Sequence, residues 1–76
     1  MPQPPLISTD VAVKVFAAFG WQVVRRESTH ITLHKAGSRY ILTLVQRREM
    51  PRGTLRSQIH RAGITVEEFI EAWRSL

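Results

Sequence analysis

The sequence contains no cysteine, few acidic residues and no long apolar run, and each of these absences excludes a class of protein. Without cysteine there is neither a disulfide framework nor a thiolate metal site, which fits a reducing compartment. No segment approaches the roughly 20 consecutive apolar residues that span a bilayer. The opening MPQPPLI also lacks the charged and apolar regions of a signal peptide. We therefore expect a cytoplasmic protein that does not enter a membrane.

Positive charge is what the sequence has in excess. Eleven Lys and Arg residues stand against six Asp and Glu residues, which gives a formal net charge of +5. An excess of this kind favours an acidic partner, of which nucleic acid is the commonest. An acidic protein partner fits the same charge, and so does a basic surface that is only solvated.

The hydrophobic pattern predicts one domain, 1–76, with elements in the order α-β-β-β-α-α. Residues 1–6 hold three of the four prolines and are predicted to be a flexible lead-in. The predicted helices cover 9–19, 54–62 and 66 onward, and the predicted strands cover 21–27, 30–35 and 40–45. The strands form an antiparallel meander, in which the apolar last strand is expected to be the central or best-covered one. The predicted fold is α+β, with the helices on one face of a three-stranded sheet and the other face open.

Capping residues mark where the predicted helices begin and end. Ser8 is the expected N-cap of the first helix, and Gly20 follows its C-terminus. Gly63 is expected to end the second helix. The run ITVEEF predicts a capping box, in which Thr65 is the N-cap and Glu68 is the third helical residue.

His30 is the first candidate for chemistry. If Ile31 and Leu33 face the core, strand alternation places His30 on the open face of the sheet. A neutral imidazole there can accept a proton from a ribose 2′-hydroxyl or donate one to a leaving 5′-oxygen. An ordinary exposed histidine fits the same pattern. The neighbours expected to hold a phosphate or add hydrogen bonds to it are Arg25, Arg26, Ser28, Thr29 and Lys35.

The other histidines and a second basic patch are weaker candidates. His34 follows His30 by four strand residues, about 13 Å at roughly 3.3 Å per residue, which is too far for a shared metal site. His60 is expected to be a solvent residue beside the buried side of its helix. Arg52 and Arg56 are i, i+4 neighbours and are candidate phosphate contacts, with a solvated face as the alternative. The acidic residues are dispersed and no glycine-rich phosphate loop is present, so we expect no metal and no cofactor.

The sequence resembles a known family. The first predicted helix, the stretch GWQVVRRESTHITLHK and the stretch GTLRSQIHRAGITVEEF closely resemble the HicA family of small bacterial mRNA-interferase toxins, over about residues 7–73. The resemblance implies a double-stranded-RNA-binding-domain-like fold and cleavage of mRNA without a known metal requirement. It further implies that His30 is the active-site histidine and that a HicB-like antitoxin covers the active face.

Two departures from the family pattern bear on activity. The usual Gly-Ser-His reads Ser28-Thr29-His30, and serine adopts positive φ less readily than glycine. Where many members carry Val-Pro and a further histidine after the third strand, this chain has VQRR. The favoured interpretation is an mRNA-cleaving toxin in which Arg26 and Lys35 stabilise charge. The alternatives are a non-catalytic RNA-binding module of the same fold and a protein-interaction domain that binds an acidic partner.

Overall fold

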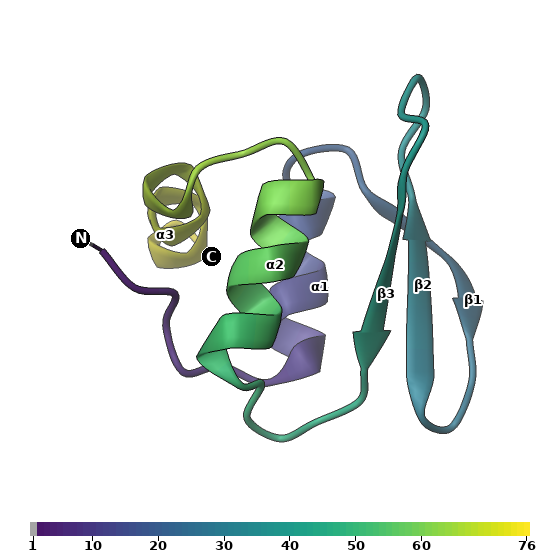
Figure 1. Ribbon diagram of the computed structural model, residues 1–76, viewed down its shortest axis with the longest axis horizontal. Coiled ribbons are helices and arrows are strands. Elements are labelled where there is room, and N and C mark those ends of the chain that lie inside the picture. Colours follow the sequence, from purple (N-terminus) through teal and green to yellow (C-terminus); the bar gives the residue numbers. More distant parts are fainter. Residues whose placement is uncertain (1) are drawn as a thin grey trace.

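The computed structural model describes residues 2–76 and confirms the predicted order of elements. The elements are α1 (Thr9–Ala17), β1 (Gln22–Arg26), β2 (His30–His34), β3 (Ile41–Val45), α2 (Arg52–Arg61) and α3 (Val66–Arg74). The strands form one antiparallel sheet in the order β1-β2-β3 (Figure 1). The central strand is therefore β2 and not the last strand, which was predicted to be the central or best-covered one. In a meander the second strand must pair with both of its neighbours, whatever the apolar content of the third.

The helices lie on one side of the sheet, as predicted (Figure 1). α1 packs against β1, α2 packs against β3, and α3 packs on both helices away from the sheet. At the contact between α1 and α3 the rings of Phe16 and Phe69 lie 5.2 Å apart, tilted by 59°. No helix within residues 2–76 is both long and apolar enough to cross a membrane.

Alternation along β2 separates a covered face of the sheet from an open face. Ile31 and Leu33 are fully buried, whereas His30 and His34 are exposed. Ile31 pairs with Leu44 and Leu33 with Leu42, so the covered face joins buried aliphatic side chains of two strands. Burial of each such side chain contributes about 1.5–3 kcal/mol, which fixes the register of β2 against β3.

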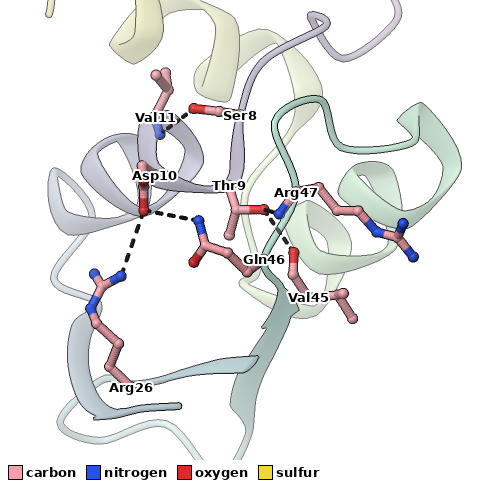
Figure 2. Close-up of polar contacts among 8 residues, drawn as sticks. All are labelled: Ser8, Thr9, Asp10, Val11, Arg26, Val45, Gln46 and Arg47. Carbon is pink, nitrogen blue, oxygen red and sulfur yellow. Dashed lines mark hydrogen bonds and ion pairs between the residues drawn. The ribbon is translucent and has the colours of Figure 1, made fainter. Parts of the chain in front are cut away.

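The capping residues act as the sequence predicts, although α1 and α2 differ from their predicted bounds, α2 at both of its ends. Ser8 accepts a hydrogen bond from the Val11 backbone N–H at 3.2 Å (Figure 2). α1 ends at Ala17, two residues early, because its last turn tightens into shorter-range hydrogen bonds before Gly20 takes a φ of 94°. The capping box of α3 is complete: the Thr65 N–H donates to the Glu68 carboxylate at 2.8 Å, and the Glu68 N–H donates back to the Thr65 hydroxyl at 3.0 Å. α2 begins two residues before the prediction, with Pro51 at its N-cap position and no side-chain cap.

A buried threonine ties the start of α1 to the end of β3. The Thr9 hydroxyl donates to the Val45 carbonyl at 2.7 Å and accepts from the Arg47 N–H at 2.9 Å (Figure 2). The Thr9 backbone N–H donates to the Arg47 carbonyl at 3.0 Å. Thr9 is fully buried, and these bonds satisfy polar groups that would otherwise be costly at the edge of the core.

The lead-in runs beside α2 within the described part of the chain. Pro4 is buried, and its carbonyl accepts a hydrogen bond from the Arg52 side chain at 3.1 Å. The Pro2 carbonyl accepts from Arg56 at 3.2 Å. The predicted flexibility of residues 1–6 stays a prediction. Met1, the first residue of that segment, lies outside the described residues.

Candidate active site on the open face of the sheet

His30 stands at the start of β2, where the backbone of two neighbouring strands fixes its place. It pairs with Val45 of β3, and its carbonyl accepts a hydrogen bond from the Glu27 N–H at 2.8 Å. Its neighbour Ile31 is fully buried on the covered face, so strand alternation directs the exposed His30 side chain away from the helices. The predicted position of His30 on the open face is confirmed.

The imidazole of His30 is held at one nitrogen by its neighbour. The Thr29 Oγ1 and the His30 Nδ1 lie 2.8 Å apart, within hydrogen-bond distance. A hydroxyl both donates and accepts. When it accepts from Nδ1–H, Nε2 carries a lone pair and can accept a proton. Once Nε2 has gained a proton, the imidazolium keeps its Nδ1–H and the hydroxyl still accepts from it. The same contact therefore orients the ring in the neutral form that accepts a proton and in the protonated form that donates one.

The turn before His30 does not need a left-handed residue. Among residues 2–76 no residue other than glycine has a positive φ, so Ser28 and Thr29 adopt ordinary backbone conformations. The Thr29 carbonyl accepts from the Gln46 N–H at 2.8 Å, which continues the β2–β3 pairing past His30. The serine that replaces the family's usual glycine is thus accommodated here without positive φ.

The two arginines of β1 lie on opposite faces of the sheet. A β-bulge interrupts the β1–β2 register between Val23 and Arg25, and beyond it Arg25 pairs with Thr32 and Arg26 pairs with Ile31. Because Ile31 faces the helices, so does Arg26. Its guanidinium lies 3.6 Å from the Asp10 carboxylate of α1 (Figure 2). The structure therefore does not bring Arg26 to the face that carries His30, because the bulge turns Arg26 to the covered face.

Lys35 also lies away from His30. It follows His34 by one residue, and its half-buried side chain packs beside Gly20 in the loop between α1 and β1. The predicted pair of charge-stabilising residues, Arg26 and Lys35, is thus not assembled at the histidine. Of the cations expected around His30, Arg25 is the one on the open face.

Arg52 and Arg56 are engaged on the helix side of the molecule. Their guanidinium groups donate to the Pro4 and Pro2 carbonyls, and α2 packs beside the covered side of the sheet. The structure confirms that they share one helix but does not bring them to His30. His60 is exposed, as predicted, and lines a hollow of about 450 Å³ between α2 and α3 that contains no residue of the sheet.

Two threonines of the open face are not among the site residues predicted from the sequence. Thr32 and Thr43 pair directly across β2 and β3, and both alternate with buried residues. Alternation within each predicted strand is enough to predict which face each threonine occupies. Their pairing could not be predicted in this way, because it depends on the register between the two strands. His34 also lies on this face, opposite Gln22 and Ile41.

Within residues 2–76 no group of three or more histidine and acidic side chains is placed to hold a metal ion. The polar groups on or beside the open face are the imidazoles of His30 and His34, the Arg25 guanidinium with the Glu27 carboxylate next to it, the Gln22 amide and the threonine hydroxyls. An imidazole can transfer protons, and the guanidinium, amide and hydroxyl groups can donate hydrogen bonds to an anion.

Comparison with known proteins identifies the family. The model described as "HicA toxin of bacterial toxin-antitoxin" matches residues 10–64, more than two thirds of the chain. The match spans the sheet, His30 and α2. Searches of the curated proteins and of the solved structures found no match. Membership of this family implies a cognate antitoxin. The chain belongs to the HicA toxin family of bacterial toxin–antitoxin systems.

Proposed function

We propose that this toxin is an endoribonuclease that cleaves mRNA, with His30 as its acid–base residue. The observation that carries the proposal is the setting of the imidazole. It is exposed on the uncovered face of a sheet and held at Nδ1 by Thr29. A net charge of +5 supports attraction of the chain to a polyanion such as RNA.

The proposed reaction is an internal displacement at a phosphodiester. The His30 Nε2 accepts the proton of a ribose 2′-hydroxyl while the 2′-oxygen bonds to phosphorus and the bond from phosphorus to the 5′-oxygen breaks. The leaving 5′-oxygen takes a proton from the imidazolium or from water. The products are a 2′,3′-cyclic phosphate and a 5′-hydroxyl. Proton transfer of this kind contributes about 10²–10⁴-fold to the rate.

We further propose that the antitoxin is a HicB-like protein that covers the open face. A partner seated there would exclude RNA from His30 and so suppress cleavage. The acidic partner favoured by the basic composition of the chain is consistent with this arrangement.

The test is a cleavage assay with purified protein on an mRNA transcript, with a chelator present. Wild type is expected to produce fragments, and His30→Ala is expected to lower the rate at least 100-fold, the lower end of the acid–base contribution of about 10²–10⁴-fold. The matched control is His60→Ala, which removes an exposed histidine on α2 and is expected to cleave like wild type.

Three outcomes would contradict the proposal. If His30→Ala cleaves at the wild-type rate, the catalytic assignment is wrong. If wild type shifts RNA in a salt-dependent manner but yields no fragments, the protein is an RNA-binding module. If it neither binds nor cleaves RNA and binds only an acidic partner, it is a protein-interaction domain.

A further inference from the structure

We propose that Arg25, Thr32 and Thr43 form a phosphate-binding row across the open face, within reach of His30. The ligand is a backbone phosphate of RNA, and the inference rests on the proposed function in taking RNA as the substrate. It assigns to Arg25 the charge-stabilising role that the sequence analysis gave to Arg26 and Lys35.

The row follows from the register of the sheet. Arg25 of β1 pairs with Thr32 of β2, and Thr32 pairs with Thr43 of β3. Paired residues project from the same face, with Cβ atoms about 4.5–5.5 Å apart. One guanidinium and two hydroxyls therefore line up across the three strands. All are hydrogen-bond donors, which suits an anion.

The row lies beside the candidate acid–base residue. Thr32 follows His30 by two residues on β2, a distance of about 6.6 Å at roughly 3.3 Å per residue. Both side chains project from the same face because strand alternation has a period of two. An RNA backbone that placed one phosphodiester at His30 would therefore bring the same or the next phosphate over the row.

The bulge in β1 selects which arginine joins the row. Val23 pairs with Leu33, whose buried side chain faces the helices. Uninterrupted alternation from Val23 would turn Arg25 to the helices and Arg26 to the open face. The extra residue Val24 reverses this assignment, and bulges are known to re-aim a side chain in this way.

The contacts of the two arginines agree with the placement of Arg25 on the open face and Arg26 on the covered face. Arg26 reaches the Asp10 carboxylate across to α1. Arg25 lies 3.8 Å from the Glu27 carboxylate, with the two side chains 71% and 54% exposed. This pair is no tighter than the 3.6 Å pair of Arg26 with Asp10, and the two arginines differ in the face that they occupy. An ion pair this exposed contributes little to stability, so a phosphate can replace Glu27 at little cost. The Arg25 guanidinium is thus available to a ligand.

The test measures RNA binding in the His30→Ala background, so that cleavage does not interfere. The probe is a short fluorescein-labelled single-stranded RNA, followed by anisotropy over a range of salt. Arg25→Ala is expected to weaken binding about tenfold and to reduce the salt dependence by about 0.7 in log–log slope, the value for one phosphate contact on a single strand. Thr43→Val is expected to weaken binding by about two- to tenfold through loss of one hydrogen bond. The matched control is Arg26→Ala, which is expected to stay within about twofold because it removes the same charge from the other face.

The outcomes separate this inference from the nuclease proposal. If Arg26→Ala weakens RNA binding as much as Arg25→Ala does, or more, the proposed phosphate-binding row is wrong. If Arg25→Ala abolishes binding but wild type yields no fragments, the row stands and the nuclease proposal fails. If cleavage requires His30 but Arg25→Ala binds and cleaves like wild type, the nuclease proposal stands and the row fails. Equal urea midpoints for the two arginine variants establish that a difference in binding is not a difference in folding.

Discussion

The covered face and the open face of the sheet are built from alternate residues of the same strands. On the covered face Ile31 and Leu33 are fully buried against the helices. On the open face His30 is exposed, and Thr32 pairs with Thr43. Neighbours in sequence therefore belong to different physical environments, one that stabilises the fold and one that we propose binds RNA. Substitutions one residue apart should have effects of different kinds, and this is how the comparison can be tested.

The largest effect on stability is expected on the covered face. Leu33→Ala removes a fully buried side chain from the central strand, and we expect a loss of about 2–5 kcal/mol in the free energy of unfolding. Urea unfolding followed by circular dichroism measures it. Its control is His34→Ala, the next residue on the open face, which is expected to stay within about 0.5 kcal/mol. Equal losses for both variants would contradict the division between the faces.

A smaller loss of stability is expected when the Thr9 hydroxyl that joins α1 to the end of β3 is removed. Thr9→Val keeps the shape of the side chain but leaves the Val45 carbonyl and the Arg47 N–H without the hydroxyl that bonds both. The expected cost is about 1–3 kcal/mol. The same chemical change at Thr43, on the open face, is expected to alter stability by less than about 0.5 kcal/mol. If urea midpoints fall equally in both variants, the hydrogen bonds of Thr9 are not what stabilises this junction.

The smallest effect is expected for the ion pair on the covered side of β1. Arg26 and Asp10 lie 3.6 Å apart, with side chains 54% and 62% exposed. Solvent screens such a pair, so Arg26→Ala is expected to cost about 0–1 kcal/mol. A double-mutant cycle with Asp10→Ala isolates the coupling between the two residues. A coupling well above 1 kcal/mol would show that Arg26 stabilises the fold more than its exposure indicates.

Local signals predicted much of the fold from the sequence. Ser8, Gly20 and the Thr65–Glu68 box act on backbone groups within a few residues, so the sequence alone defines their role. Alternation in β2 likewise places His30 opposite Ile31. The order of the elements followed from these signals.

The cations around the site were not predictable in the same way. The bulge at Val24 depends on how β1 pairs with β2, and nothing in the local sequence marks it, so counting along the strand gives the wrong face for Arg26. Arg52 and Arg56 have the helical spacing that was predicted. Their partners, however, are carbonyls 48 and 54 residues away, which only the tertiary structure brings close.

The most direct test of the account is the rate of mRNA cleavage per folded molecule in two variants of adjacent residues. His30→Ala should keep the wild-type urea midpoint and lose at least about 100-fold in cleavage. Ile31→Val should unfold more easily, by about 0.5–1.5 kcal/mol, and cleave at the wild-type rate once corrected for the folded fraction. Wild-type cleavage by folded His30→Ala would contradict the claim that the open face of β2 carries the chemistry.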